Sequence, residues 1–199
     1  MGAEVAEEFR MIQDLVAKFV DNELMPLEPA VLAREIKGEK LALTKEEEGP
    51  LLRKCKELGL WGLDAPPELG GMNLPATVWM AINEELGRTV TPFVFPPDSP
   101  NLHMLLATVD DNQRRKYLEP YARGDATGAI AISEPGAGGD PAGMTTRAEK
   151  DDGGWVINGR KIWISRVAAA DFTIVMARIG SGKRHEGITA FIVEKGTPG

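Results

Sequence analysis

Up to about residue 125, apolar residues recur every three or four positions, which is the period of an amphipathic helix. The first stripe consists of Val5, Phe9, Ile12, Val16 and Val20. Thr44 and Glu47 have the spacing of a capping box, so a helix is predicted to begin there and to end at Gly59. A further helix is predicted from Pro75 to Gly87. Two more are predicted, one carrying Leu102, Leu105, Leu106 and Val109 and one over 114–122.

After residue 125 the period changes to two, and β-branched residues gather between Gly and Asp turns. Strands are predicted at about 127–133, 143–149, 154–158, 160–166, 172–178 and 187–193. The Asn158-Gly159 pair accepts the positive φ of a type I′ turn, so it predicts a hairpin between the strands on either side.

Helices first and strands afterwards favour an α+β class with segregated layers over a βαβ alternation. The predicted organisation is an N-terminal helical domain over 1–125 and a β domain over 126–199.

Charge and cysteine content narrow the class of protein further. Lys and Arg number 23 against 30 Asp and Glu, a formal net charge of −7, which argues against nucleic-acid binding because phosphate contacts need a basic face. No apolar run is long enough for a membrane span, and the N-terminus does not have the pattern of a signal peptide. Cys55 is the single cysteine, so neither a disulfide framework nor a metal site is predicted. We therefore expect an intracellular protein, cytoplasmic or, for a processed eukaryotic precursor, in the mitochondrial matrix.

The strongest chemical signal lies at residues 131–143, AISEPGAGGDPAG. It lacks the Gly-Lys-Ser/Thr of a P-loop, and Pro141 stands where a dinucleotide fingerprint needs glycine. What remains is a strand ending at Ser133 and a glycine-rich turn whose backbone N–H groups can approach a ligand closely. A tight connection between strands explains the same residues equally well.

A second signal is the predicted strand Arg160-Lys-Ile-Trp-Ile-Ser165. Alternation would place Trp163 and Ser165 on one face, roughly 6.6 Å apart, where an indole and a hydroxyl could both meet one flat heteroaromatic ring. Taken alone, the strand favours a core tryptophan beside a solvent-facing serine.

Together these segments resemble the acyl-CoA dehydrogenase family. SEPGAGGD stands at the position of the family's Thr-Glu-Pro-Gly-Ala-Gly-Ser-Asp signature, and RAEKDDGGWVINGRKIWIS matches the segment that follows. ELGLWGLDAPPELGG, the Glu-Glu-Leu-Gly of 84–87 and NQRRKYLEPYARGD resemble its N-terminal helical domain. The resemblance covers nearly the whole chain.

The resemblance implies FAD as cofactor and α,β-dehydrogenation of an acyl-CoA thioester, an activity of fatty-acid metabolism. The residues that it implies for flavin binding are Ile130, Ile132, Ser133, Gly138, Gly139, Trp163, Ile164 and Ser165. Gly139 would also contact the substrate, although it replaces a family serine and can offer only its N–H. Ser133 and Ser165 replace threonines, and Arg166 follows where the family has an Asn-Gly-Gly type of turn.

The resemblance also implies that the strands pair antiparallel in a barrel-like sheet, which the chain leaves incomplete because it ends within the β domain. It further implies that the chain omits the C-terminal domain that carries the family's catalytic base. No catalytic residue is therefore predicted here, and the chain alone is expected to be inactive. Electron-transfer flavoprotein as electron acceptor and a homo-oligomer (dimer or tetramer) are further implied. The alternatives are a non-catalytic fragment or interaction protein, and a flavin oxidase or monooxygenase of the same fold.

Overall fold

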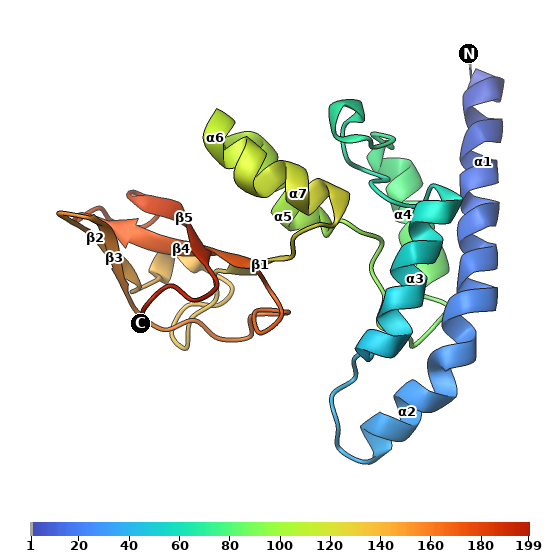
Figure 1. Ribbon diagram of the computed structural model, residues 1–199, viewed down its shortest axis with the longest axis horizontal. Coiled ribbons are helices and arrows are strands. Elements are labelled where there is room, and N and C mark those ends of the chain that lie inside the picture. Colours follow the sequence, from blue (N-terminus) through green and yellow to red (C-terminus); the bar gives the residue numbers. More distant parts are fainter. Residues whose placement is uncertain (1) are drawn as a thin grey trace. The chain divides into compact units, whose positions relative to one another are not determined.

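The computed structural model describes residues 2–199, without the side chains of 2–6 and 8, so Val5 of the predicted stripe lies outside the described side chains. The contacts divide the chain into two compact units, one up to Ser99 and one from Pro100 to Gly199 (Figure 1). The domain boundary predicted at residue 125 rests on a change in periodicity and stays a prediction.

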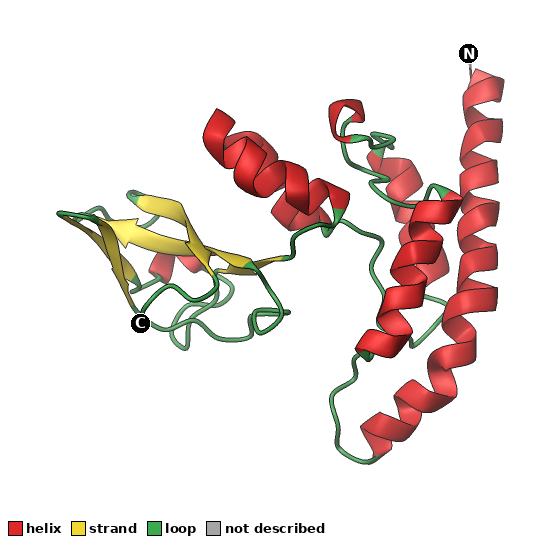
Figure 2. Ribbon diagram, viewed as in Figure 1, coloured by secondary structure: helices red, strands yellow, loops and turns green. Residues whose placement is uncertain are grey.

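The first unit consists of helices and loops (Figure 2). Its elements are α1 (Gly2–Phe19), the π-helical turn η1 (Val20–Leu24), the 3-10 turn η2 (Met25–Leu27), α2 (Glu28–Ile36), α3 (Lys45–Leu58), η3 (Pro67–Leu69) and α4 (Ala76–Leu86).

Its core forms around three phenylalanine rings. The ring centroids of Phe19, Phe93 and Phe95 lie 5.5 Å apart in each pair. Val16 and Val20 of the predicted stripe are buried in the same cluster, and so is Cys55. Burial, followed by the charge of Glu23, raises the pKa of the Cys55 thiol to about 12. Cys55 therefore acts as a small apolar core residue.

The predicted capping box and the predicted end of α3 are confirmed, but one helix was not predicted. The Thr44 side chain accepts from the Glu47 N–H while Glu47 accepts from the Thr44 N–H, which is the predicted capping box. Gly59 ends α3 in the left-handed conformation at φ 70°. The helix α2 was not predicted. It has nine residues and leaves Ile36 86% exposed, so it presents only a short apolar pattern.

The second unit places helices against a sheet. The helical elements are α5 (Ser99–Thr108), α6 (Asp111–Gln113), the π-helical turn η4 (Arg114–Leu118), α7 (Glu119–Arg123) and the 3-10 turn η5 (Pro141–Gly143). The strands are β1 (Gly128–Ala131), β2 (Arg147–Asp151), β3 (Gly154–Asn158), β4 (Phe172–Ile179) and β5 (Ile188–Glu194). Tyr117 and Tyr121 both contact the Phe172 ring, so η4 and α7 pack on β4.

The sheet is mixed, which corrects the predicted antiparallel pairing. The order is β1-β4-β2-β3, with β5 also paired to β4. β1 and β2 both run parallel to β4, whereas β2–β3 and β4–β5 are antiparallel. Among the described strands the sheet does not close into a barrel. Sequence alternation is the same for parallel and antiparallel partners in a half-buried sheet, so it could not decide the direction.

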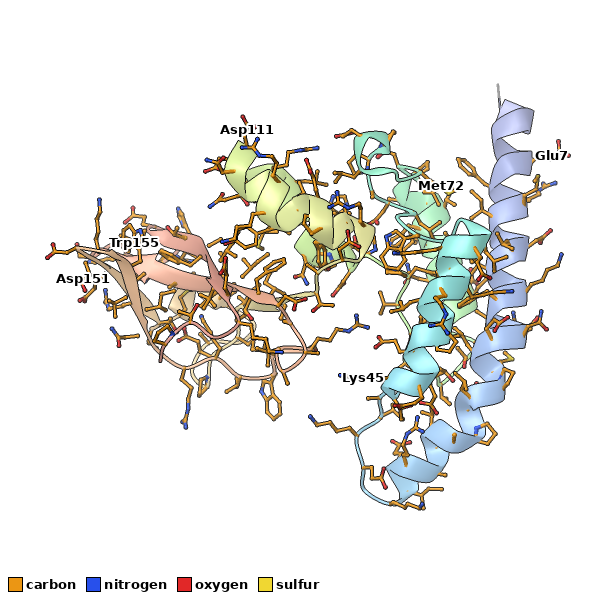
Figure 3. The ribbon with its side chains drawn as sticks, viewed as in Figure 1. Glu7, Lys45, Met72, Asp111, Asp151 and Trp155 are labelled. Carbon is orange, nitrogen blue, oxygen red and sulfur yellow. The ribbon has the colours of Figure 1, made fainter. Side chains whose placement is uncertain are left out.

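Two strand predictions and one turn prediction were wrong. The strand predicted at 143–149 starts only at Arg147, because Gly143 belongs to η5 and the N–H groups of Thr145 and Thr146 donate to the Glu134 side chain. The hairpin turns at Asp152-Gly153 (Figure 3 labels the neighbouring Asp151 and Trp155), not at Asn158-Gly159. A Cβ on Gly159 would lie 2.2 Å from Thr146 Oγ1, so this glycine serves a close approach to Thr146.

The predicted strand at 160–166 is absent from the described structure, where residues 160–164 are irregular and 165–169 form a turn. The polar groups of this segment bond to the loop at 132–134 instead of to a neighbouring strand. Trp163 and Ser165 therefore do not share a strand face. Trp163 has φ 59° and Arg166 φ 62°, in a region that bulky residues rarely adopt.

Candidate functional site

The glycine-rich segment that follows β1 forms a closed turn. The Glu134 N–H donates to the Ala137 carbonyl at 2.9 Å, and the Ala137 N–H donates to the Glu134 carbonyl at 3.2 Å. Gly138 and Gly139 continue from this turn, exposed, and a Cβ on either would meet nothing within 4 Å. Their N–H groups donate to no backbone carbonyl among the described residues. The backbone here can therefore donate hydrogen bonds to a ligand, as predicted for a glycine-rich turn.

The segment that carries Trp163 lies directly beside this turn. The Ile162 N–H donates to the Ser133 carbonyl at 3.0 Å, and Lys161 Nζ donates to the Ile132 carbonyl at 3.0 Å. Two of the predicted flavin residues, Ile132 and Ser133, are thereby brought to the residues that precede Trp163. The two segments that carry the chemical signals of the sequence are therefore adjacent, although the expected strand is absent.

Trp163 is the most exposed large apolar side chain among the described residues, at 88% of its full area. A tryptophan in water forgoes the large free-energy gain that burial of its ring would bring. Its left-handed backbone is a second cost, of order 1–3 kcal/mol. An exposed indole on a strained backbone is typical of a binding surface.

A buried carboxylate lies behind the turn. The Glu134 side chain is 2% exposed and accepts four hydrogen bonds, from the N–H and Oγ1 of Thr145 (2.7 and 2.8 Å), the N–H of Thr146 (3.0 Å) and Nζ of Lys161 (2.8 Å). Burial would raise the pKa of Glu134, but the hydrogen bonds from Lys161, Thr146 and Thr145 outweigh it and hold this pKa well below its usual range. Glu134 is therefore an anion with its acceptor positions occupied.

The turn that follows Trp163 is held at its far end. The Thr127 N–H and Oγ1 both donate to Asp171 Oδ2, at 2.7 and 2.9 Å, and Thr127 Oγ1 also contacts the Ala169 carbonyl at 3.0 Å. Hydrogen bonds from the Thr127 backbone and side chain lower the pKa of Asp171. These contacts connect the end of the 165–169 turn to the start of β1.

The other predicted residues lie at separate places in the same unit. Ile130 is half-buried on β1, opposite Ile174 of β4. Ile164 is half-buried and Ser165 exposed, where the chain enters the turn. No hydrogen bond joins Gly138, Gly139 or Ser165 to Trp163 within the described residues.

Sequence reasoning missed Glu134 and Lys161 as parts of the site. Both lie inside the motifs that carry the family resemblance. Glu134 follows the apolar strand Gly128–Ala131 closely, and Lys161 precedes the run Ile-Trp-Ile. Each of these charged residues lies next to an apolar segment, and charged residues are rarely buried unless they are paired. Their opposite charges were the signal that could have predicted an ion pair.

A cavity of about 480 Å³ lies elsewhere in the second unit. Lys116, Tyr117, Trp155 and Phe191 are among its lining residues, with the last two rings 5.4 Å apart, and none of the predicted site residues lines it. Within residues 2–199, no group of three or more His, Cys, Asp or Glu gathers in a way that could hold a metal ion. No described helix has the length and apolar character needed to cross a membrane.

Comparison with known families matches both halves of the chain. "Acyl-CoA dehydrogenase, N-terminal domain" matches residues 6–125, and "Acyl-CoA dehydrogenase, middle domain" matches residues 129–199. These two matches define a class of flavoprotein oxidoreductases, and the chain belongs to the acyl-CoA dehydrogenase family.

Individual relatives agree with this family. (R)-benzylsuccinyl-CoA dehydrogenase of Thauera aromatica is 35% identical over 100% of this chain and 52% of its own length. The structure of butyryl-CoA dehydrogenase from Megasphaera elsdenii superposes with a TM-score of 0.76 at 31% identity, over 96% of this chain and 49% of that one. A glutaryl-CoA dehydrogenase from Mycobacterium smegmatis in complex with FADH2 has a TM-score of 0.75 at 27% identity, over 96% and 46%. The chain spans about half the length of the relatives that it matches, and members of the family depend on FAD.

Proposed function

We propose that this chain supplies the flavin-holding part of an enzyme that dehydrogenates an acyl-CoA thioester between its α and β carbons. The observation that carries the proposal is the exposed indole of Trp163 next to the Ser133 turn, within a family that uses FAD. An apolar plate, hydroxyls and unpaired N–H groups are the donor set that a flat heteroaromatic ring with polar edges requires.

Each predicted residue has a binding role in this proposal. Trp163 packs against the ring, while Ile130, Ile132 and Ile164 contribute apolar contact. The hydroxyls of Ser133 and Ser165 and the N–H groups of Gly138 and Gly139 offer hydrogen bonds. FAD, when bound, supplies the acceptor for the two electrons that leave the thioester.

Gly139 is the residue proposed to contact both cofactor and substrate. A Cβ at this position would meet nothing within 4 Å, so the site has room for the side chain that the family usually has there. Glycine offers only its N–H, and the substrate must supply the remaining contacts. An acyl-group preference different from that of relatives with a serine here is therefore expected.

No residue of this chain is assigned as the base that removes the α-proton. Glu134 lies within the site, but its carboxylate is buried and already accepts four hydrogen bonds, so it cannot take a proton from a substrate. We propose that the base comes from outside residues 1–199. Electron-transfer flavoprotein as acceptor, a homo-oligomeric state and a role in fatty-acid metabolism rest on the family resemblance.

Anaerobic titration of the full-length protein tests the proposal. The purified protein is expected to carry the visible absorption of oxidised flavin, and a panel of acyl-CoA thioesters is expected to bleach it. Protein that binds FAD but is bleached by no thioester would favour the oxidase or monooxygenase alternative. Protein that binds no flavin would contradict the proposal.

The same titration on residues 1–199 alone tests the assignment of the base. General bases contribute about 10²–10⁴-fold in rate, so this chain is expected to leave added FAD oxidised. Rapid stoichiometric bleaching by the isolated chain would place the base within it.

A further inference from the structure

Glu134 joins three segments that are far apart in the sequence. Its carboxylate bonds to Thr145 and Thr146, which lead into β2, and to Lys161, which precedes the Trp163 segment. Its own backbone closes the Glu134–Ala137 turn. One buried side chain therefore connects the turn, the start of a strand and the irregular segment.

Lys161 forms the other half of this connection. Its side chain is 11% exposed, and Nζ donates to Glu134 Oε1 at 2.8 Å and to the Ile132 carbonyl at 3.0 Å. The next residue, Ile162, donates its N–H to the Ser133 carbonyl at 3.0 Å. These bonds involve consecutive residues on both segments, so they fix Ser133 relative to Trp163.

Regular secondary structure does not hold this segment. Residues 160–164 belong to no helix or strand, so no ladder of backbone hydrogen bonds determines where Trp163 lies. The Trp163 backbone is in the left-handed region, which persists only where surrounding contacts impose it. Within the described residues, the contacts nearest in sequence on its N-terminal side are those of Lys161 and Ile162.

A second charged residue holds the far side of the glycine-rich segment. Arg178 is 5% exposed, and its guanidinium donates to the carbonyls of Ala142 (2.8 Å), Gly182 (3.1 Å) and Glu186 (2.6 Å). Along the chain, Gly138 and Gly139 thus lie between Glu134, which is bonded to Lys161, and Ala142, which is bonded to Arg178. These bonds fix the residues on both sides of the two exposed glycines, whose backbone stays open to a ligand.

We propose that Glu134 and Lys161 are positioning residues of the flavin site. They contact no ligand themselves. The buried pair holds the Ser133 turn and the Trp163 segment at one spacing, so that a hydroxyl, backbone N–H groups and an indole meet a single ring. The inference rests on the proposed flavin binding, and it assigns a role to two residues that the binding set does not include.

The test compares FAD affinity in full-length variants. Lys161→Met keeps the length of the side chain but removes its donors, whereas Lys161→Arg keeps a cation and its donors. Lys150→Met is the matched control, because Lys150 is exposed on β2 and makes no hydrogen bond or ion pair with the residues of the site. We measure the FAD dissociation constant by fluorescence and the visible circular dichroism of the bound flavin.

Lys161→Met is expected to weaken FAD binding about tenfold or more and to change the circular dichroism of the flavin that remains. Lys161→Arg is expected to restore most of the affinity, and Lys150→Met to match the wild type. Unchanged affinity and circular dichroism in Lys161→Met would overturn the inference.

A core variant separates a positioning role from a general loss of folding stability. Leu105→Ala, on α5 and outside the site, removes a side chain that is 1% exposed. If it lowers FAD affinity and changes the flavin spectrum as much as Lys161→Met at a similar melting temperature, the pair has no positioning role. Preserved affinity in Leu105→Ala supports the inference.

A milder variant covers the case in which Lys161→Met does not fold. Thr145 is exposed, and Thr145→Val removes only the 2.8 Å hydrogen bond from its hydroxyl to Glu134. It is expected to weaken FAD binding a few-fold, and unchanged binding would count against the inference. Wild-type protein that binds no FAD would overturn the proposed function itself.

Discussion

Two ion pairs among the described residues are largely shielded from water, and they lie in different units. Arg34 and Glu47 connect α2 and α3, with side chains 20% and 16% exposed. Lys161 and Glu134 connect two irregular segments, with side chains 11% and 2% exposed. In the first unit the helices and the capping box already define the local backbone. In the second unit, the hydrogen-bonded charges of Lys161 and Glu134 connect segments that belong to no helix or strand.

The two ion pairs differ in what else constrains the segments that they join. The guanidinium of Arg34 binds Glu47 through both Nη atoms at 2.9 Å and also donates to the Ala42 carbonyl, so it holds the loop between two helices. That pair adds to a structure that other contacts maintain. The Lys161–Glu134 pair decides the course of its segments, because no strand or helix constrains them.

The largest expected effect is on folding stability when Lys161 is removed. Lys161→Met leaves the Glu134 charge buried without its cation, which costs about 3–5 kcal/mol for a buried pair. Urea unfolding of the full-length protein measures this change, with Lys150→Met expected within about 0.5 kcal/mol of wild type. Equal midpoints for both variants would show that Glu134 is stabilised without Lys161.

A smaller loss is expected at the corresponding pair of the first unit. Arg34→Met removes charge-assisted hydrogen bonds worth about 1.5–3 kcal/mol, while water can still reach part of Glu47. The matched control is Arg53→Met, on the exposed face of α3. A loss as large as that of Lys161→Met would remove the proposed difference between the two pairs.

Acid should weaken the wild type more than the variant that lacks Lys161. The pKa of Glu134 is lowered in the folded state, so its contribution to stability is complete above the unfolded value of about 4.3 and is lost as pH falls below it. One such group changes the unfolding free energy by at most about 1.4 kcal/mol per pH unit. We expect the gap between wild type and Lys161→Met to narrow when urea midpoints at pH 5, 4 and 3 are compared.

A similar but weaker narrowing is expected for Arg34→Met. Hydrogen bonds from Arg34 and from the Thr44 backbone lower the pKa of Glu47, though less than that of Glu134. A gap that stays constant from pH 5 to 3 in both variants would contradict the linkage.

The smallest stability effects are expected at two tryptophans, and they separate structure from binding. Trp163→Ala should change the unfolding free energy by less than about 0.5 kcal/mol, because the indole is 88% exposed, yet it should reduce FAD retention. Trp155→Ala should cost about 1 kcal/mol through the lost Phe191 contact and leave FAD retention unchanged. Flavin content per protein after gel filtration checks both, with Ser165→Ala expected to lose less flavin than Trp163→Ala. Equal flavin content in wild type and Trp163→Ala would contradict the site.

Much of the fold was predictable because its signals are local. Thr44, Glu47 and Gly59 define the ends of one helix through hydrogen bonds and backbone conformation within a few residues. Periodicity likewise separated the helical segments from the strands. The hairpin turn was misplaced because Asn158-Gly159 and Asp152-Gly153 are both favourable turn dipeptides, and pairing of Arg147 with Asn158 decided between them.

The flavin-binding role of the candidate residues stays a prediction, and the way their segments are built differs from what the sequence predicts. The Ile162 N–H donates to the Ser133 carbonyl, so the two predicted segments are adjacent, yet the strand expected at 160–166 is absent. Its alternation of apolar residues has the form of a strand, while Lys161 and Ile162 bond to Ile132, Glu134 and Ser133. Propensity describes a segment alone, and here tertiary contacts override it.

The sequence by itself determined the helical and β halves, the helix caps and the family, because each depends on neighbouring residues or on motifs in order. Tertiary structure alone decided that β1 and β2 run parallel to β4 and that Lys161 reaches Glu134, 27 residues away. A buried charge acquires its partner only when the chain has folded, since the gain of pairing must exceed the cost of removing both groups from water.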